Sequence, residues 1–207
     1  GIQPAQSDYF QSVKGGGHGD YHLVVLAPST IQEMVDLVQE GYDIADQYRN
    51  PVMILGDGML GQMMEPVEFK ERKPRQLPAK DWAATGWKGD RPRAIINSLF
   101  IDPQVLENHV NKMFQKYEAI KANETMVECY HCENAEIIVA AYGTTARIIK
   151  SVIELADREG IKVGLIRPIT VWPFPTSAFS NWAVKDHVKA FLTVEMSMGQ
   201  MVEDVTL

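Results

Sequence analysis

The most constraining feature of this sequence is a pair of apolar runs with a helical pattern between them. Residues 22–27 form a near-continuous apolar run rich in β-branched side chains, which predicts a strand buried on both faces. Apolar residues then recur at helical spacing over 31–45, and a second apolar run follows Asn50 and Pro51 at 52–55. A strand, a helix and a strand within so short a stretch predict a parallel crossover unit.

A second unit of the same kind lies near the end of the sequence. Residues 137–142 predict a strand, and residues 146–159 predict a helix with one buried side that Gly160 terminates. Further strands are predicted at 162–166 and 190–194. The two units together predict an α/β fold built from parallel-sheet crossover units.

The sequence between the two units has a different character. It begins with a charged, proline-punctuated run at 70–78, and two tryptophans follow among glycines, so an extended irregular connection is predicted. Residues 103–122 then recover a helical pattern. We therefore expect three stretches, of which the middle one is a linker with one helix: residues 1–69, 70–132 and 133–207.

Composition and charge exclude several classes of protein. The net charge of −7 and the pI near 5.2 argue against a nucleic-acid partner, because phosphate contacts need clustered Lys and Arg. No apolar run is long enough to cross a bilayer and no secretory signal is visible, so a cytoplasmic protein without membrane contact is expected. The chain begins at Gly1 without Met and ends inside an apolar-periodic pattern, which leads us to expect a fragment of a longer protein.

A cluster of soft ligands spans residues 129–132, Cys-Tyr-His-Cys. A zinc or iron–sulfur site needs at least one further ligand-rich cluster, and the sequence offers none. No metal site is therefore predicted, and both cysteines are expected to stay reduced.

Two stretches resemble a known family. Residues 1–61, above all the run from Ser7 through a glycine-rich loop to STIQEM at 29–34, are similar to the second half of the pyrimidine-side domain in α subunits of 2-oxoacid:ferredoxin oxidoreductases. Residues 141–175, AYGTTARIIKSVIELADREGIKVGLIRPITVWPFP, resemble the C-terminal domain of transketolase-like thiamine enzymes, with its pattern GI-x-V followed by RP-x-T-x-x-PFP. The 2-oxoisovalerate type is the nearest in resemblance and the 2-oxoglutarate type comes next.

The resemblance implies an incomplete pyrimidine-side thiamine-enzyme domain, followed by a transketolase C-terminal-like domain truncated at its end. Enzymes of this family oxidatively decarboxylate a 2-oxoacid to acyl-CoA and pass the electrons to ferredoxin. They use thiamine diphosphate, Mg²⁺ and iron–sulfur clusters carried on other subunits, with coenzyme A as cosubstrate. The implied partners are a β subunit, which holds the diphosphate and Mg²⁺, and γ or ferredoxin-like subunits.

The resemblance also says what to expect of the site. The Glu that activates the cofactor in this family precedes the matched residues, so no catalytic residue is expected here, and the fragment alone is expected to be structural and inactive. The glycine-rich loop at 15–20 lies on the side that faces the cofactor in the family. We hypothesise that Gly17, His18 and Gly19 line the pocket of the completed enzyme; a purely structural loop is the alternative. A strand follows this loop, so it is not a dinucleotide fingerprint.

Gly56-Asp57-Gly58 has the form of the first half of the thiamine-enzyme magnesium motif. That motif requires an Asn-Asn pair further along the chain, so that Asp and Asn oxygens meet on one hard cation. The sequence contains no Asn-Asn pair. A strand-ending turn is therefore predicted at this position, where glycine allows tight backbone geometry.

Two other functions remain open at this point. The chain could be part of a transketolase-type or 2-oxoacid dehydrogenase β-like thiamine enzyme, which passes its acyl group to a lipoyl carrier, although residues 1–30 argue against it. It could also be a module that binds a regulatory small ligand near residues 143–145, because doubly wound folds bind ligands at the carboxyl ends of their strands.

Overall fold

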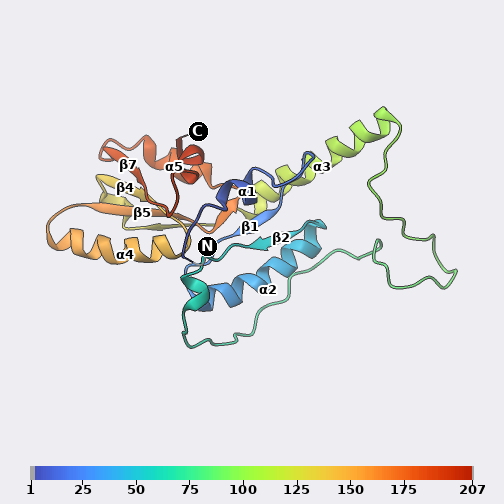
Figure 1. Ribbon diagram of the computed structural model, residues 1–207, viewed down its shortest axis with the longest axis horizontal. Coiled ribbons are helices and arrows are strands. Elements are labelled where there is room, and N and C mark those ends of the chain that lie inside the picture. The colour runs from blue at the N-terminus through green and yellow to red at the C-terminus, as the bar shows by residue number, and fades with distance from the viewer. Residues whose placement is uncertain (1–2, 207) are drawn as a thin grey trace.

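The computed structural model describes residues 3–206 as an α/β body from which a long arm extends (Figure 1). Residues 1, 2 and 207, which belong to the first and third predicted stretches, lie outside the described residues. The body contains two sheets, one of three strands and one of four. No helix among the described residues is long and apolar enough to span a membrane.

The first sheet contains the predicted crossover unit. β1 (Val24–Leu26) and β2 (Val52–Ile54) run parallel, and α2 (Ile31–Tyr48) connects them. The helix begins where predicted, because the Thr30 side chain accepts a hydrogen bond from the backbone N–H of Glu33 at 3.1 Å. α1 (Tyr9–Val13) precedes this unit, and η1 (Leu60–Gln62) follows it.

The third strand of this sheet comes from the far end of the chain. β6 (Thr170–Trp172) pairs antiparallel with β1, so the order is β2-β1-β6. The sequence pattern did not predict β6, because three residues next to two prolines give too short a run to recognise as a strand. This strand joins the first and third predicted stretches into one sheet.

The second sheet has the order β3-β5-β4-β7. Its parallel strands are β4 (Ile137–Ala140), β5 (Val163–Pro168) and β7 (Ala190–Thr193), with α4 (Gly143–Arg158) as the crossover between β4 and β5. Gly160 follows α4 with φ 73°, the left-handed conformation expected of a glycine that terminates a helix. α5 (Thr176–Ala183) and α6 (Met201–Thr206) complete the body.

The middle of the chain forms the arm. Residues 63–101 contain no helix or strand, as predicted, and then α3 (Pro103–Glu124) returns to the body. Asp102 caps this helix by accepting hydrogen bonds from the backbone N–H groups of Gln104 and Val105. The outer half of α3 and the loop before it project away from the sheets (Figure 1).

The predicted linker also carries a strand that the sequence did not reveal. β3 (Val127–Tyr130) pairs antiparallel with β5 and forms one edge of the second sheet. Exposed and half-buried residues alternate along β3, so it lacks the continuous apolar run by which the other strands were predicted. The division into stretches 1–69, 70–132 and 133–207 remains a prediction, but residues 127–130 pack as part of the second sheet.

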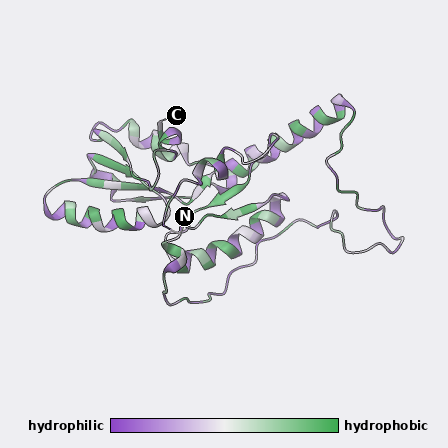
Figure 2. Cartoon of the chain, in the orientation of Figure 1, coloured by the Kyte–Doolittle hydropathy of each residue, from purple (hydrophilic) through white to green (hydrophobic). Residues whose placement is uncertain are grey.

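One hydrophobic cluster runs through both sheets. It includes side chains from α1, β1, α2, the base of α3, β4, β5 and α6, such as Tyr9, Leu26, Ile44, Ile120, Ile138, Ile166 and Met201. A smaller cluster lies between α4 and the second sheet around Ile149, Ile153 and Leu165. Figure 2 shows the hydrophobic colour concentrated on the strands and on the helix faces turned towards them. The shared cluster ties the two sheets into one body.

Candidate functional site

The glycine-rich loop predicted to face a cofactor is exposed along its whole length, from Gly15 to Asp20. Gly15 and Gly19 have φ values of 96° and 114°, which only glycine adopts readily. The loop folds back on Tyr21, whose hydroxyl accepts a hydrogen bond from the backbone N–H of Gly16 at 3.1 Å. The loop therefore presents free backbone and the His18 side chain to its surroundings.

A cavity of about 420 Å³ lies beside this loop. The first glycines of the loop line it, together with side chains in or next to α1, Tyr21, and apolar side chains at or next to β1 and β2, including Asp8, Ser12, Leu23, Met53 and Leu55. His18, Gly17 and Gly19 do not line this cavity. The structure thus places the three predicted site residues near a cavity without bringing them into its wall.

A larger cavity of about 840 Å³ opens on the other side of His22. The His22 ring stacks on Trp172 with 4.6 Å between ring centroids, and its buried Nδ1 has no hydrogen-bond partner. Burial, and then the charge of Lys121, lower the pKa of His22, so the ring is neutral near pH 7. Lys14 also lines this cavity, but it forms an ion pair with Asp204.

Asp57 joins the carboxyl ends of β2 and β4. Its carboxylate accepts hydrogen bonds from the Thr144 hydroxyl at 2.9 Å and from the Thr144 N–H at 3.3 Å. It also accepts hydrogen bonds from the backbone N–H groups of Met59 and Leu60 at the start of η1. β2 ends at Ile54 and the chain turns into η1 at Leu60, in line with the strand-ending turn predicted at 56–58, and the Asp57 oxygens fasten two parts of the chain together.

Gln6 fills the remaining space at this junction and is 4% exposed. Its amide donates to the carbonyl oxygen of Tyr142 at 3.0 Å and accepts from the Thr145 hydroxyl at 2.9 Å and the Met196 N–H at 3.0 Å. Residues 143–145, predicted as a possible ligand site, are therefore buried and already bonded to Gln6 and Asp57. Among the described residues, this arrangement favours a structural joint at residues 143–145 over a ligand site.

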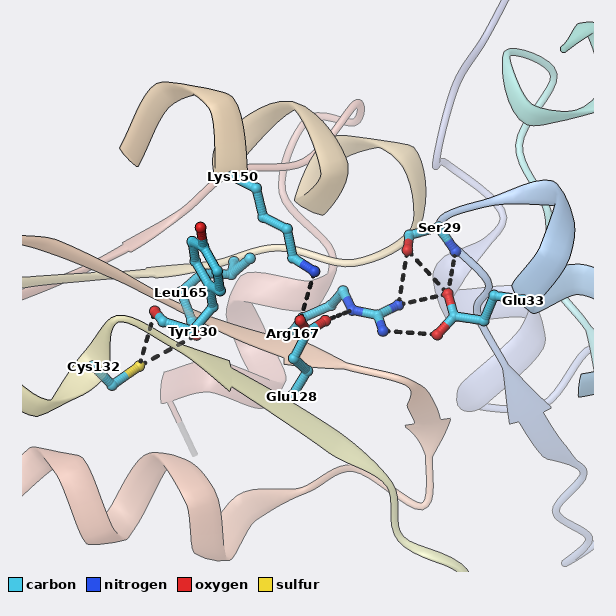
Figure 3. A network of polar contacts seen from close by, with 8 residues as sticks. All are labelled: Ser29, Glu33, Glu128, Tyr130, Cys132, Lys150, Leu165 and Arg167. Carbon is cyan, nitrogen blue, oxygen red and sulfur yellow. Dashed lines mark hydrogen bonds and ion pairs between the residues drawn. The ribbon is translucent and has the colours of Figure 1, made fainter. Parts of the chain in front are cut away.

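Arg167 is the centre of a second joint between the sheets (Figure 3). It lies on β5 with a side chain only 5% exposed, and its guanidinium binds both carboxylate oxygens of Glu33, from α2, at 2.7 and 2.9 Å. Its Nε donates to Glu128 on β3 at 2.6 Å, and Lys150 on α4 donates to the other oxygen of Glu128 at 2.5 Å. Three elements, β5, α2 and β3, therefore meet at one buried guanidinium, which grips Glu33 in the two-pronged geometry that Arg favours, and Lys150 ties α4 to the cluster through Glu128.

The two carboxylates in this joint are held in their charged form. Burial by itself would raise the pKa of Glu33, but the hydrogen bonds and charge of Arg167, with the Ser29 N–H and hydroxyl, lower it. Burial likewise opposes ionisation of Glu128, and Lys150 and Arg167 together lower its pKa. The cluster stays ionised near neutral pH and links α2 to the second sheet.

The two cysteines differ in environment. Cys129 is exposed on β3, whereas Cys132 is buried and its thiol donates to the carbonyl oxygen of Leu165 at 3.2 Å (Figure 3). Burial, and then the neighbouring Cys129, raise the pKa of the Cys132 thiol to about 12. Among the described residues, no group of three or more His, Cys, Asp or Glu side chains is placed to hold a metal ion.

Two family models match this chain in order. Residues 1–129 match the model described as pyruvate flavodoxin/ferredoxin oxidoreductase, thiamine diphosphate-binding, and residues 135–207 match pyruvate:ferredoxin oxidoreductase core domain II. The first model alone covers more than half of the 207 residues. The chain belongs to the 2-oxoacid:ferredoxin oxidoreductase family. The predicted family is confirmed, and the match over residues 1–129 argues against a transketolase-type enzyme outside it.

Named relatives agree with the family models. The ketoisovalerate oxidoreductase subunit VorB of Methanothermobacter marburgensis is 45% identical over 206 residues, covering 100% of this chain and 58% of the relative. The 2-oxoglutarate synthase subunit KorA of the same organism is 29% identical, covering 97% of this chain and 60% of the relative. The chain therefore spans somewhat more than half the length of these relatives.

A solved structure shares the fold. The 2-oxoglutarate:ferredoxin oxidoreductase from Magnetococcus marinus, with 2-oxoglutarate, coenzyme A and succinyl-CoA bound, aligns with a TM-score of 0.79 at 21% identity. The alignment covers 99% of this chain and 40% of that one. The α/β fold of crossover units predicted from the sequence is thus confirmed.

Sequence reasoning did not find the residues that hold the two sheets together. Gln6 and Glu33 lie in the stretch that resembles the family, but they were given no role of their own, and Asp57 was weighed as a metal ligand against a strand-ending turn. Arg167 lay within the quoted RP-x-T pattern, which was the one signal that could have drawn attention to it. Its role depends on Glu33, 134 residues upstream, and on Glu128, 39 residues upstream. No local sequence pattern specifies these ion pairs.

Proposed function

We propose that this chain is part of the α subunit of an enzyme that oxidatively decarboxylates a branched-chain 2-oxoacid to its acyl-CoA and passes the electrons to ferredoxin. The observation that carries this proposal is the 45% identity to a ketoisovalerate oxidoreductase subunit along the whole chain. The lower identity to 2-oxoglutarate synthase subunits makes 2-oxoglutarate the second candidate substrate.

The thiamine diphosphate that this family implies fits the chain only in part. Apolar side chains at the start of β1 and along the end of β2 (Leu23, Met53 and Leu55) form a wall of the 420 Å³ cavity beside the glycine-rich loop, and such a wall suits an aminopyrimidine ring. A diphosphate needs cationic side chains or a metal, yet among the described residues no Lys or Arg lines this cavity, and Asp8 adds a carboxylate to it. We therefore assign the pyrimidine side to this chain, and the diphosphate and Mg²⁺ to a companion β subunit.

In this assignment the cofactor supplies the carbanion chemistry when bound, and the chain supplies positioning. Leu23, Met53 and Leu55 would exclude water from one side of an aminopyrimidine ring held in this cavity. The backbone of the glycine-rich loop and the Tyr21 hydroxyl offer hydrogen-bonding groups at the mouth of the cavity. Gly17, His18 and Gly19 would line the pocket once the companion subunit covers the loop, which is exposed in the chain by itself.

The proposed assembly follows from the same reasoning. Iron–sulfur clusters would be carried by γ or ferredoxin-like subunits, because no metal-ligand cluster is present among the described residues. Ferredoxin would accept the electrons, and coenzyme A would take the acyl group. A cytoplasmic location agrees with the two free thiols of the chain. Within the assembly, this chain has a structural role and no turnover of its own.

The test is reconstitution. The chain, and separately the full-length α subunit, are mixed with the companion β subunit and assayed for reduction of a viologen dye that depends on both 2-oxoisovalerate and CoA. Stable binding of the chain without turnover, together with turnover by the full-length subunit, supports the proposal. Turnover by the chain alone, or turnover with 2-oxoglutarate in preference to 2-oxoisovalerate, contradicts it.

A further inference from the structure

A segment of the chain lies along α2 without belonging to either sheet. Residues 65–82, which we call the strap, follow η1, run beside α2 and contain no helix or strand (Figure 1). Among the described residues, no backbone–backbone hydrogen bond joins the strap to a helix or sheet of the body, and none of its side chains belongs to either hydrophobic cluster. The strap is therefore attached mainly through polar side chains.

One end of the strap is fixed at the start of α2. The Glu65 carboxylate accepts a hydrogen bond from the backbone N–H of Ile31 at 3.0 Å and forms an ion pair with Arg147 of α4 at 2.6 Å. The Gln32 side chain donates to the carbonyl oxygen of Glu68 at 3.0 Å and accepts from the Glu68 N–H at 2.8 Å. These contacts set the register of the strap on the helix.

Opposite charge holds the rest of the strap to the helix. α2 carries five acidic residues and no Lys or Arg along its 18 residues. Acidic groups near the C-terminus of a helix are unfavourable, because the helix dipole is negative there. The strap supplies the missing cations: Arg72 pairs with Glu40 and, at 3.6 Å, with Asp43; Arg75 pairs with Glu40 at 2.5 Å; and Lys80 pairs with Asp46 at 2.6 Å.

Arg75 also reaches beyond α2 to α3. Its guanidinium donates to both carboxylate oxygens of Glu124, at 2.8 and 3.1 Å, and the Tyr48 hydroxyl at the end of α2 donates to the same carboxylate at 2.9 Å. The Glu124 side chain is 8% exposed, so removing its cation would leave a buried carboxylate uncompensated. A residue of the strap thus holds the inner end of α3 against the end of α2.

We propose that the strap is a latch operated by salt: it is closed on α2 at low ionic strength and dissociates from α2 as one unit at high ionic strength, while both sheets stay folded. The side chains that pair the strap with α2 are 25–46% exposed, and salt screens charges at such exposure. The screening length falls from about 10 Å at about 0.1 M salt to about 3 Å at about 1 M. Arg167, which joins the sheets, has a side chain only 5% exposed and is screened far less, and the apolar clusters do not depend on charge.

Release of the strap changes two parts of the molecule together. The acids of α2 that pair with the strap are left as an uncompensated acidic face, and Glu124 loses Arg75. Tyr117 and Ile120 keep the inner end of α3 packed in the body. Ionic strength therefore sets how firmly α3 is held against α2 without unfolding either helix.

Limited digestion with chymotrypsin measures the release, because this protease cleaves after aromatic residues and needs a locally opened segment. Phe69 lies in the strap with its side chain 79% exposed, and the chain is held on both sides of it, by Glu68 on Gln32 and by Arg72 on α2. Phe100 lies outside the strap and is the internal standard in the same sample. The rate of cleavage after Phe69, divided by the rate after Phe100, is expected to rise roughly tenfold or more between about 0.1 M and about 1 M NaCl. The far-UV circular dichroism should stay constant over this range.

Variants of the strap test which residues hold it. Arg75→Gln should raise the cleavage ratio roughly fivefold or more at about 0.1 M NaCl, because it removes the pairs with Glu40 and Glu124. The double variant Arg75→Gln, Glu124→Gln removes the uncompensated buried charge as well, so it should keep the high ratio with the circular dichroism of the wild type. The matched control is Lys73→Gln, since Lys73 is an exposed strap cation that forms none of the ion pairs with α2 among the described residues. It should behave as the wild type.

Three results would overturn the proposal. The first is a cleavage ratio in the wild type that does not change with salt. The second is a ratio for Arg75→Gln, or for the double variant, that equals the ratio for Lys73→Gln. The third is a loss of circular dichroism that accompanies the rise in the ratio, because the strap then opens only when the body unfolds.

Discussion

Replacing Arg167 should show how much of the stability of this chain depends on the joint between its sheets. In Arg167→Met the side chain keeps most of its volume and loses every polar contact to Ser29, Glu33 and Glu128. Glu33 and Glu128 then lose their positively charged partner. Their side chains are 23% and 28% exposed, so both carboxylates stay largely out of contact with water. The loss of folding free energy comes mainly from these two carboxylates, because they remain partly buried without the guanidinium that compensated their charge.

The expected loss follows from how buried the partners are. Breaking a fully buried ion pair by removing one partner costs about 3–5 kcal/mol. The lower end applies here, because both carboxylates retain some solvent and Lys150 remains on Glu128. We expect about 3 kcal/mol, which in a domain of this size corresponds to a drop in Tm of roughly 6–12 °C.

The effect should depend on pH in one direction. Glu33 and Glu128 have lowered pKa values in the folded wild type, so their contribution is fully present above their ordinary pKa of 4.5. It is lost as the pH falls through the lower folded values. In Arg167→Met most of this contribution is already gone. The difference in stability between wild type and variant should therefore be largest at pH 7 and shrink below pH 4.5.

The assay is urea denaturation followed by circular dichroism at pH 7 and pH 4 for wild type, Arg167→Met and the control Arg158→Met. Arg158 is an exposed residue at the end of α4, and its substitution should change the free energy of unfolding by less than about 0.5 kcal/mol. A loss below about 1 kcal/mol for Arg167→Met would refute the reasoning from burial. A loss that is equal at both pH values would refute the assignment to Glu33 and Glu128.

Three further predictions concern single sites. Gly164→Ala should destabilise the chain by about 1–3 kcal/mol in thermal denaturation, because its Cβ would meet the Cys132 Cα at 2.9 Å. Gly61→Ala, whose Cβ meets nothing within 4 Å, is the control, and equal effects at both positions would contradict the steric argument. Iodoacetamide at pH 8 should label the exposed Cys129 in the native chain and spare Cys132, because burial raises the pKa of the Cys132 thiol to about 12. Mass spectrometry of the labelled peptides measures both sites. Early labelling of Cys132 would count against its burial. His18→Ala should leave Tm unchanged, because the His18 side chain is exposed. If His18 lines the pocket, the same substitution should lower the turnover of the reconstituted enzyme about tenfold or more. Unchanged turnover would mean that the loop is only a structural element.

The elements that were predicted correctly are those whose signal is local. The strands at β1, β2 and β4 are apolar runs flanked by turn residues, and α2, α3 and α4 show helical periodicity with a recognisable start or end. The turn at 56–58 was also predictable, because glycine on either side of an aspartate favours tight geometry. In each case a stretch of the chain has one strongly preferred conformation whatever surrounds it.

The elements that were missed depend on partners elsewhere in the chain. β6 and β3 are short, and each becomes a strand only because β1 or β5 offers it hydrogen bonds. The sequence gives no sign of which groups the junction residues Gln6, Asp57 and Arg167 contact, although Asp57 and Arg167 lie within recognisable patterns. They acquire roles because folding brings together carboxylates, amides and backbone groups that lie far apart along the chain.

The sequence by itself determined the family, the α/β class and the two crossover units, because apolar periodicity and a long shared pattern are properties of the order of residues. Only the tertiary structure decided that one core and one mixed sheet join the two halves, and that a buried guanidinium on β5 holds α2 and β3 together. It also decided that the glycine-rich loop and the arm face outwards. The physical reason is that burial and hydrogen bonding depend on the distance between groups in space, which the spacing of residues along the chain does not fix.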